Sequence, residues 1–247
     1  MRGDRYRNFA YEDRPGRIQF WQRRCDTADG RRDIWYATPH PSYPTNATKA
    51  LLRKPSSEVA DRCLYTGQSP EVSREVWETL RGGGGSGDEL VWCEGESDVD
   101  AVLEEDWPAV THHGGAVALA KLGQARALRK FRGTVYVAVD LDDAGARCAV
   151  ERVRLLYLVG FPSTRVELIG PAGFEWAEKG GADLRDHLAL GRSLTETREL
   201  RMTDLRGRAD RAIERRASEP ATWYREDDTL RPLVVSGRDG ERVQLTE

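Results

Sequence analysis

The sequence lacks several features that mark particular protein classes. Its four cysteines, Cys25, Cys63, Cys93 and Cys148, form no CxxC pair and have no histidine cluster beside them, which favours buried free thiols over a zinc site. No GxxxxGK[ST] motif occurs, which excludes a P-loop ATPase or helicase motor from these residues. The longest apolar run, residues 155–161, is too short to cross a bilayer, and the charged start MRGDRYRNFAYEDR is unlike a signal peptide. We therefore expect a cytoplasmic protein with no membrane segment.

Charge is plentiful and nearly balanced. The 247 residues hold 38 Lys and Arg against 41 Asp and Glu, a net charge of −3 that excludes a uniformly basic, histone-like protein. Residues 1–88 contain 15 basic and 12 acidic residues (net +3), whereas residues 89–192 contain 12 and 17 (net −5). A basic segment beside an acidic one suits a protein that holds a polyanion near a metal site. Ordinary variation also produces such a difference, and charge alone favours that explanation.

Residues 1–88 form a basic, aromatic-rich region that we expect to fold as a small β-containing subdomain. Alternating residues at 18–21 and 33–36, with a turn-like sequence at 28–30 between them, predict a hairpin. Residues 71–80 have the apolar spacing of a helix. The glycine-rich residues 82–87 match GxGxxG in letters, but they follow a helix and precede a strand, so a connector is favoured over a dinucleotide site.

From residue 89 to residue 192 the pattern becomes regular. Short apolar runs predict strands at residues 90–93, 109–111, 135–139 and 166–169. Helical patterns come between and after them, at residues 98–105, 116–129, 143–159 and 183–190. This alternation predicts an α/β fold, a parallel four-stranded sheet with helices on both faces. Residues 193–247 form a polar C-terminal extension, for which we expect a helix at about 196–217 and a strand at 233–235.

Acidic residues follow the expected strands at their carboxyl ends, where open parallel sheets collect their ligands. They are Glu94, Asp140, Asp142, Asp183 and Asp186. Carboxylates that converge from separate strands repel one another, and a hard divalent cation relieves that cost. Such an ion bridges readily to phosphate oxygens. Each acid alone could instead cap a helix, but together Glu94, Asp140 and Asp142 favour a functional site.

Small residues accompany these acids. Gly95 follows Glu94, and Ala144 and Gly145 follow the second acidic group. Without bulky side chains, they would let a phosphate approach the backbone closely.

Two segments resemble the motifs of TOPRIM domains. Residues 90–100 (LVWCEGESDVD) are similar to the first motif, a strand ending in Glu-Gly before an acidic helix start. Residues 135–145 (VYVAVDLDDAG) are similar to the second, a strand ending in Asp-x-Asp. Residues 180–188 resemble the lysine–aspartate–x–x–aspartate segment of phage and plasmid primases, with Ala182 in the leading position. The resemblance covers about residues 88–192, and residues 113–116 and 147–156 look most like the primase branch.

The resemblance implies roles for individual residues. The glutamate matching Glu94 acts as a general acid or base in nucleotidyl transfer, and the aspartates matching Asp140 and Asp142 bind Mg²⁺ or Mn²⁺. Asp183 or Asp186 would complete the metal shell. By two-metal logic, one ion activates a ribose 3′-hydroxyl while the other steadies the triphosphate leaving group.

Nucleic acid and nucleotide need basic or aromatic groups as well. One candidate set lies near Trp21 and Trp35, and its members are Arg23, Arg24, Arg31 and Arg32. A weaker set lies in or just after the expected helix at 116–129, and its members are Lys121, Arg129 and Lys130. Only 5 of the 38 basic residues are Lys, so arginine is also the default surface cation here. His113 could face the nucleotide, together with Gly95 and Gly145.

The resemblance implies a primase-like nucleotidyltransferase that makes short primers on single-stranded DNA from nucleoside triphosphates, from a phage or mobile element. A metal-dependent nuclease using the same acids is the alternative enzyme, and a non-catalytic nucleic-acid-binding adaptor in replication is the third possibility. Full primases usually carry a zinc ribbon and often a helicase domain. We recognise neither in these residues, so we expect a separate helicase or zinc-ribbon chain to supply template recognition.

Overall fold

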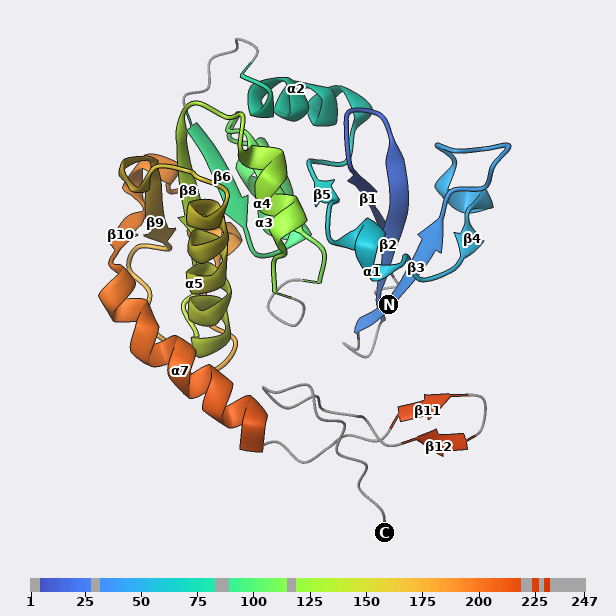
Figure 1. The fold of residues 1–247 in the computed structure, drawn as a ribbon. Coiled ribbons are helices and arrows are strands. Elements are labelled where there is room, and N and C mark those ends of the chain that lie inside the picture. The colour runs from blue at the N-terminus through green and yellow to red at the C-terminus, as the bar shows by residue number, and fades with distance from the viewer. Residues whose placement is uncertain are drawn as a thin grey trace.

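The structure, a computed structural model, describes residues 5–27, 32–82, 89–114, 119–218, 224–226 and 229–231 (Figure 1). Most of its strands belong to one mixed sheet with the order β10-β9-β8-β6-β7-β5-β1-β2-β3-β4. In chain order these strands are β1 Arg5–Glu12, β2 Ile18–Asp26, β3 Arg32–Thr38, β4 Leu51–Leu52, β5 Leu64–Tyr65, β6 Glu89–Cys93, β7 Ala109–His112, β8 Thr134–Ala138, β9 Val166–Gly170 and β10 Arg198–Leu200. A separate ribbon pairs β11 Tyr224–Glu226 with β12 Thr229–Arg231.

The centre of the sheet is parallel. Strand β6 pairs in parallel with β7 on one side and β8 on the other, and β8 pairs in parallel with β9. The α/β class and the four parallel strands agree with the sequence analysis. The expectation of a sheet of only four strands was wrong, because both outer parallel strands accept an antiparallel neighbour: β10 joins β9, and β5 joins β7. Through β5 the sheet continues into the N-terminal strands.

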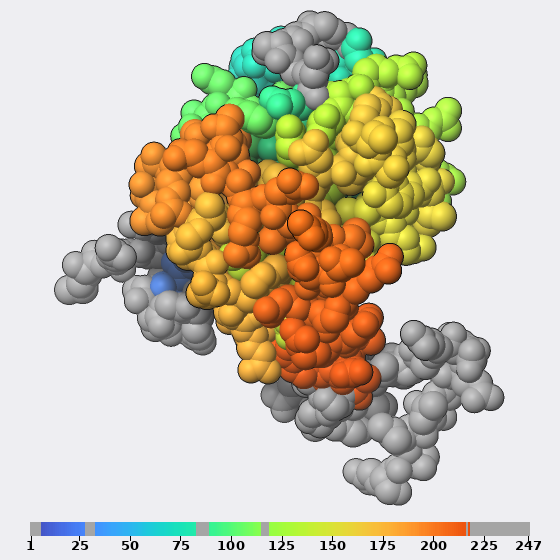
Figure 2. Space-filling model, turned by 90° about the vertical axis from the view of Figure 1, so that its left-hand side faces the viewer, coloured from blue at the N-terminus to red at the C-terminus, as the bar shows by residue number. Residues whose placement is uncertain are grey.

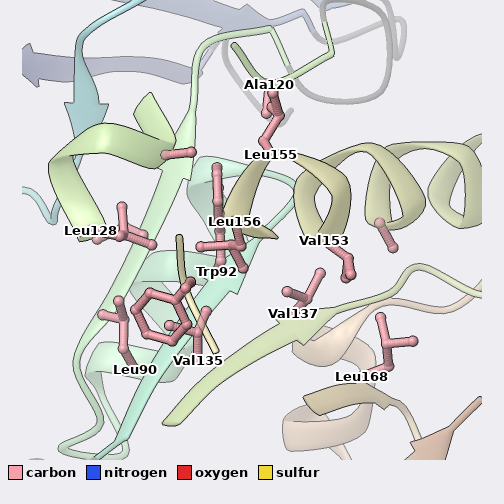
Figure 3. Close-up of a cluster of buried hydrophobic side chains, with 14 of the residues drawn as sticks. Leu90, Trp92, Ala120, Leu128, Val135, Val137, Val153, Leu155, Leu156 and Leu168 are labelled. Atoms are coloured by element: carbon pink, nitrogen blue, oxygen red, sulfur yellow. The ribbon is translucent and has the colours of Figure 1, made fainter. Parts of the chain in front are cut away.

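Helices cover both faces of the sheet. They are α1 Ser57–Ala60, α2 Pro70–Leu80, α3 Glu96–Leu103, α4 Leu122–Leu128, α5 Asp143–Leu158, α6 Leu184–Ala189 and α7 Met202–Ser218. Successive strand residues point to opposite faces. Leu90 and Trp92 therefore pack with α2, α4 and α5, whereas Val91 and Cys93 pack with α3 and α6. Figure 3 shows the first group beside Leu128 of α4 and Leu156 of α5. Because both faces of β6 are apolar and covered, its sequence is a continuous apolar run.

The N-terminal region adds a three-stranded antiparallel unit. The expected hairpin is present as β2 and β3, although its turn at 28–30 lies outside the described residues. Strand β1 was not predicted and pairs along the whole length of β2. Most of the glycine-rich segment and the strand expected at 233–235 also lie outside the described residues. The division of the chain into regions 1–88, 89–192 and 193–247 stays a prediction.

The C-terminal helix begins later than the sequence suggests. Residues 198–200 form β10 instead of helix, because pairing with β9 buries Leu200 beside the core. Helix α7 then packs against α5 (Figure 1). Its residues lie on the face of the molecule that Figure 2 turns toward the viewer. Asp143, the first residue of α5, forms ion pairs with three arginines of α7, Arg208, Arg211 and Arg215. No helix in the described part of the chain is both long and apolar enough to cross a membrane.

Candidate active site

A cavity of about 600 Å³ lies where the parallel strands end, beside the N-terminal strands. One side of it carries four carboxylates: Glu94, Asp98, Asp140 and Asp183. Glu94 follows β6, Asp98 lies in the first turn of α3, Asp140 follows β8, and Asp183 precedes α6. We call this space the acid cavity. Its remaining lining residues are Gln22, Arg24, Ile34, Tyr36, Lys54, Gly95, Glu96, Ser97, His113, Gly114 and Arg185.

The strand pairing explains why two of these acids meet. Trp92 and Val137 are partners in the parallel ladder of β6 and β8, so Glu94 and Asp140 leave the sheet side by side. A third acid is brought in by the loop before α6, whose Ala182 carbonyl accepts the Leu141 N–H at 2.9 Å. Asp183 itself caps α6 by accepting the Asp186 N–H at 2.9 Å. The convergence therefore follows from the backbone and does not depend on side-chain rotamers.

Burial and mutual repulsion make the carboxylates hard to ionise. Burial raises the pKa of Asp98 to about 8, with further contributions from the charges of Asp183 and Glu94. The pKa of Asp140 lies well above its usual value, first because of burial and then because of Glu94, Asp98 and Asp183. Burial also raises the pKa of Asp183. The cavity therefore holds more negative charge than it can stabilise without a proton or a cation.

Sequence reasoning missed Arg152, a fully buried cation beneath these acids. Its guanidinium donates to the carbonyl oxygens of Trp92, at 2.5 Å, and Ala138, at 2.8 Å, near the ends of β6 and β8. Its charge opposes the rise in the pKa of Asp140. A signal was present, because Arg152 lies on the apolar face of the helix expected at 143–159, where a charged residue needs a buried partner.

Two predicted acids serve the backbone instead of lining the cavity. Asp142 is the N-cap of α5, and its carboxylate accepts the N–H groups of Gly145 at 2.8 Å, Gly180 at 2.7 Å and Gly181 at 3.1 Å. Asp186 accepts the Asp183 N–H at 3.2 Å within the cap of α6.

The three residues expected to meet a nucleotide differ in position. Gly95 and His113 line the acid cavity, whereas Gly145 does not. A Cβ on Gly145 would overlap the Asp140 carbonyl oxygen and lie 2.8 Å from the Asp140 Cβ, so this glycine lets α5 approach Asp140 closely. The His113 and Tyr36 ring centroids are 5.0 Å apart. Burial lowers the pKa of His113.

The basic lining comes from three segments that are far apart in the chain. Arg24 of β2, Lys54 after β4 and Arg185 of α6 line the acid cavity. Glu96 of α3 contacts the N-terminal strands, because it accepts the Tyr11 hydroxyl and the Gln22 amide, both at 2.5 Å. Burial raises the pKa of Glu96, and the Tyr11 hydrogen bond opposes the rise.

The other predicted nucleic-acid contacts lie elsewhere. Arg23 is adjacent to Arg24 in β2 but belongs to a different cavity. Lys121, Arg129 and Lys130 lie in or around α4 and do not line the acid cavity. Arg31 lies outside the described residues, as does the side chain of Arg32.

The donor chemistry of the acid cavity suits a hard divalent cation, since oxygen ligands and few other donors surround it. The Asp98 Oδ1 atom is buried and has no hydrogen-bond partner among the described residues, which is a position that a cation or a proton would satisfy. Within the described ranges, no three Asp, Glu, His or Cys side chains already stand close enough to hold an ion. Binding would therefore draw the carboxylates together.

No protein-family model matches the chain, and no curated protein matches it either. Among solved structures, it is similar to the zinc-binding and RNA polymerase domains of the Aquifex aeolicus primase, with 21% identity and a TM-score of 0.48 over 84% of this chain and 44% of that one. It is also similar to a DNA primase domain from Pseudomonas aeruginosa, with 16% identity and a TM-score of 0.38 over 78% of this chain and 51% of that one. The chain thus spans about half the length of these solved primase chains. Similarities this distant do not assign it to a family.

Proposed function

We propose that the acid cavity catalyses metal-dependent nucleotidyl transfer, in which nucleoside triphosphates extend a short primer on single-stranded DNA. One observation carries the proposal: Glu94, Asp98, Asp140 and Asp183 share a single cavity with a basic wall. Carboxylates of this kind suit Mg²⁺ or Mn²⁺, and the wall suits the phosphates of the substrate. The resemblance of residues 88–192 to TOPRIM domains supports the same reading.

The proposed roles divide between the two sides of the cavity. Asp140 and Asp183 would hold the metal, and a bound ion would lower the pKa of the attacking hydroxyl and offset charge on the phosphates. Arg24 and Lys54 would bind the triphosphate. The primer 3′-oxygen forms a bond to the α-phosphorus while the bond to the bridging oxygen breaks and pyrophosphate leaves. Glu94 accepts the hydroxyl proton.

Asp142 has a supporting part in this proposal. Its three backbone hydrogen bonds hold the start of α5 against residues 180–181. It thereby fixes the loop that presents Asp140 to the cavity. The TOPRIM resemblance gives it a metal-binding role instead, and comparing Asp142→Asn with Asp140→Asn tests which description holds.

The test is primer synthesis from labelled nucleotides on single-stranded DNA, with Mg²⁺ or Mn²⁺, by the whole chain alone and with a helicase or zinc-ribbon protein. Asp140→Asn should reduce the rate by about 100-fold or more, since it removes a carboxylate that would bind the metal at the reacting centre. Asp210→Asn makes the same chemical change on the exposed surface of α7 and should leave the rate unchanged.

Three results would contradict the proposal. Wild-type protein that makes no product under any of these conditions would do so, as would equal rates for Asp140→Asn and Asp210→Asn. Cleavage of DNA without added nucleotides, lost in Asp140→Asn, would identify the site as a nuclease instead.

A further inference from the structure

A second cavity lies on the opposite face of the β2–β3 ladder from the acid cavity. It has a volume of about 300 Å³ and is lined by Tyr6, Arg7, Asn8, Arg23, Trp35 and Thr48. We call it the Trp35 pocket. The alternation of strand residues separates the two cavities: in β2, Arg24 lines the acid cavity while Arg23 lines the Trp35 pocket. Tyr36 and Trp35 divide in the same way in β3.

The strand register gathers the lining side chains into one row. Asn8 is the cross-strand partner of Arg23, and Arg23 is the partner of Trp35, so the three lie side by side on one face of β1, β2 and β3. Tyr6 packs edge-on against Trp35, with ring centroids 6.3 Å apart. Tyr6 is 67% exposed, which leaves a large aromatic surface open to solvent. Together the two rings form an aromatic surface on which a base could stack.

One wall of the pocket is preorganised. The Asn46 side chain accepts the N–H groups of Thr48, at 3.0 Å, and Lys49, at 3.3 Å, and it also accepts the Thr48 hydroxyl at 2.6 Å. This fixes the short turn at 47–49, whose Ala47 carbonyl accepts a hydrogen bond from the Arg23 guanidinium. The Arg23 Nε atom is buried with no hydrogen-bond partner in the described part of the chain, so this guanidinium keeps unused donor capacity.

We infer that the Trp35 pocket binds an unpaired nucleotide of single-stranded nucleic acid. Its six described lining residues include the aromatic rings of Tyr6 and Trp35 and the guanidinium of Arg23, but no carboxylate. Aromatic rings stack on any base, and an arginine binds the phosphate beside it. Asn8 and Thr48 add polar groups that can hydrogen-bond a base edge. A cavity at the small end of the range for ligand sites suits one base better than a protein partner.

The two cavities would then have separate tasks. The acid cavity would act on one nucleotide, while the Trp35 pocket would hold another part of the strand on the far side of the β2–β3 ladder. This inference rests on the proposed function only in assuming that the protein encounters single-stranded nucleic acid. Binding can be measured without metal or nucleoside triphosphate, so it is separable from catalysis.

The experiment measures fluorescence anisotropy of a labelled oligothymidylate with the full chain in EDTA at fixed salt. Trp35→Leu and Arg23→Gln should each weaken binding about tenfold, because loss of one stacked base or one desolvated phosphate contact has an effect of this size. Arg74→Gln makes the same charge change at an exposed site on α2 and should bind like wild type. Circular dichroism melts establish that each variant is folded.

A second measurement keeps the inference testable if a variant fails to fold. Wild-type protein is photocrosslinked to an oligonucleotide carrying 5-iodouracil, and the modified peptide is identified by mass spectrometry. Crosslinks at Tyr6 or Trp35 would support the inference, whereas crosslinks confined to Tyr36 in the acid cavity would overturn it. No oligonucleotide binding by wild type, or equal affinities of wild type, Trp35→Leu and Arg23→Gln, would overturn it as well.

The outcomes also separate this inference from the proposed function. If the wild type makes primers and Trp35→Leu binds the oligonucleotide as well as wild type does, the inference about the Trp35 pocket is refuted and the proposed function stands. If Trp35→Leu binds more weakly but the wild type makes no primers, the inference stands and the proposed function is refuted.

Discussion

Replacing Asp98 by Asn tests whether the acid cavity stores unfavourable charge. In the folded protein the pKa of Asp98 is about 8, against an ordinary value of 3.8. Between these two pH values the folded chain keeps a proton that the unfolded chain has lost. Stability from this group is therefore complete below pH 4 and is lost as the pH rises toward 8. The amide introduced by Asp98→Asn cannot titrate, so the variant should lack this contribution to the pH dependence.

The size of the effect follows from proton linkage. When only the folded state holds a proton, the free energy of unfolding falls by about 1.4 kcal/mol for each unit by which the pH rises. Between pH 5 and pH 7, the wild type should therefore lose about 3 kcal/mol through this proton. The amide side chain in Asp98→Asn keeps an oxygen that can accept the Gly95 N–H, as the Asp98 carboxylate does at 3.3 Å, so the helix cap is preserved.

The assay is urea unfolding followed by tryptophan fluorescence at pH 5, 6 and 7 in EDTA. Wild type and Asp210→Asn should lose stability with increasing pH more steeply than Asp98→Asn does. Replacing EDTA with Mg²⁺ or Mn²⁺ should flatten the wild-type curve, because a cation takes over the role of the proton. Equal pH slopes for wild type and Asp98→Asn would refute the reasoning, because Asp98 would then titrate as it does in the unfolded chain.

Three further substitutions test other contacts. Tyr11→Phe removes a hydroxyl donor from buried Glu96 and should lower the free energy of unfolding by about 1–3 kcal/mol in urea titrations. Asp143→Asn removes a charge that is 2% exposed and pairs with three arginines of α7; since those arginines are partly exposed, we expect a loss of about 2 kcal/mol and faster tryptic cleavage within α7. Gly145→Ala pushes α5 away from Asp140 and should cost about 1–3 kcal/mol by overpacking, together with most of the primer synthesis.

The tyrosine and glycine variants each have a matched comparison. Tyr157→Phe removes a hydroxyl from an exposed ring and should not change stability. Gly207→Ala places the same methyl group in the middle of α7, where its nearest neighbour is the flexible Arg211 side chain at 4.0 Å, and should stabilise the protein by up to about 1 kcal/mol. A Gly145→Ala variant as stable and active as wild type would disprove the close approach of α5 to Asp140. An Asp143→Asn variant with unchanged stability and proteolysis would disprove the anchoring of α7.

The parallel core could be predicted because its strands are short apolar runs between amphipathic helices. Strand β10 could not, since its three residues gain their structure only by pairing with β9. Strand β1 has alternation, with Phe9 and Tyr11 buried, but its arginines hide the pattern. The extension of the sheet through β5 depends on a two-residue pairing that leaves no mark in the sequence.

The site was predictable to the level of which strand ends meet. Glu94 and Asp140 follow adjacent parallel strands, and so they share a cavity. Asp142 has the same sequence context as Asp140, but the turn after β8 directs it toward backbone N–H groups. Asp98, which was not among the predicted acids, accepts the Gly95 N–H at the start of α3 through one oxygen and lines the acid cavity as well. Whether such an acid faces the cavity or the backbone depends on the path of the chain through the turn, which the residue type does not reveal.

The buried carboxylates of the acid cavity cost stability, and the proposed function gives a reason for that cost. A fold selected only for stability would place Asn or Ser at these positions, because each desolvated carboxylate costs free energy unless it is compensated. Arg152 compensates part of the charge by a fixed cation, and its hydrogen bonds to β6 and β8 prevent it from leaving. The remaining deficit is visible in the raised pKa values of Asp98 and Asp140. A site that keeps such a deficit, opens to a cavity and faces a basic wall is suited to receive cations together with the phosphates they neutralise.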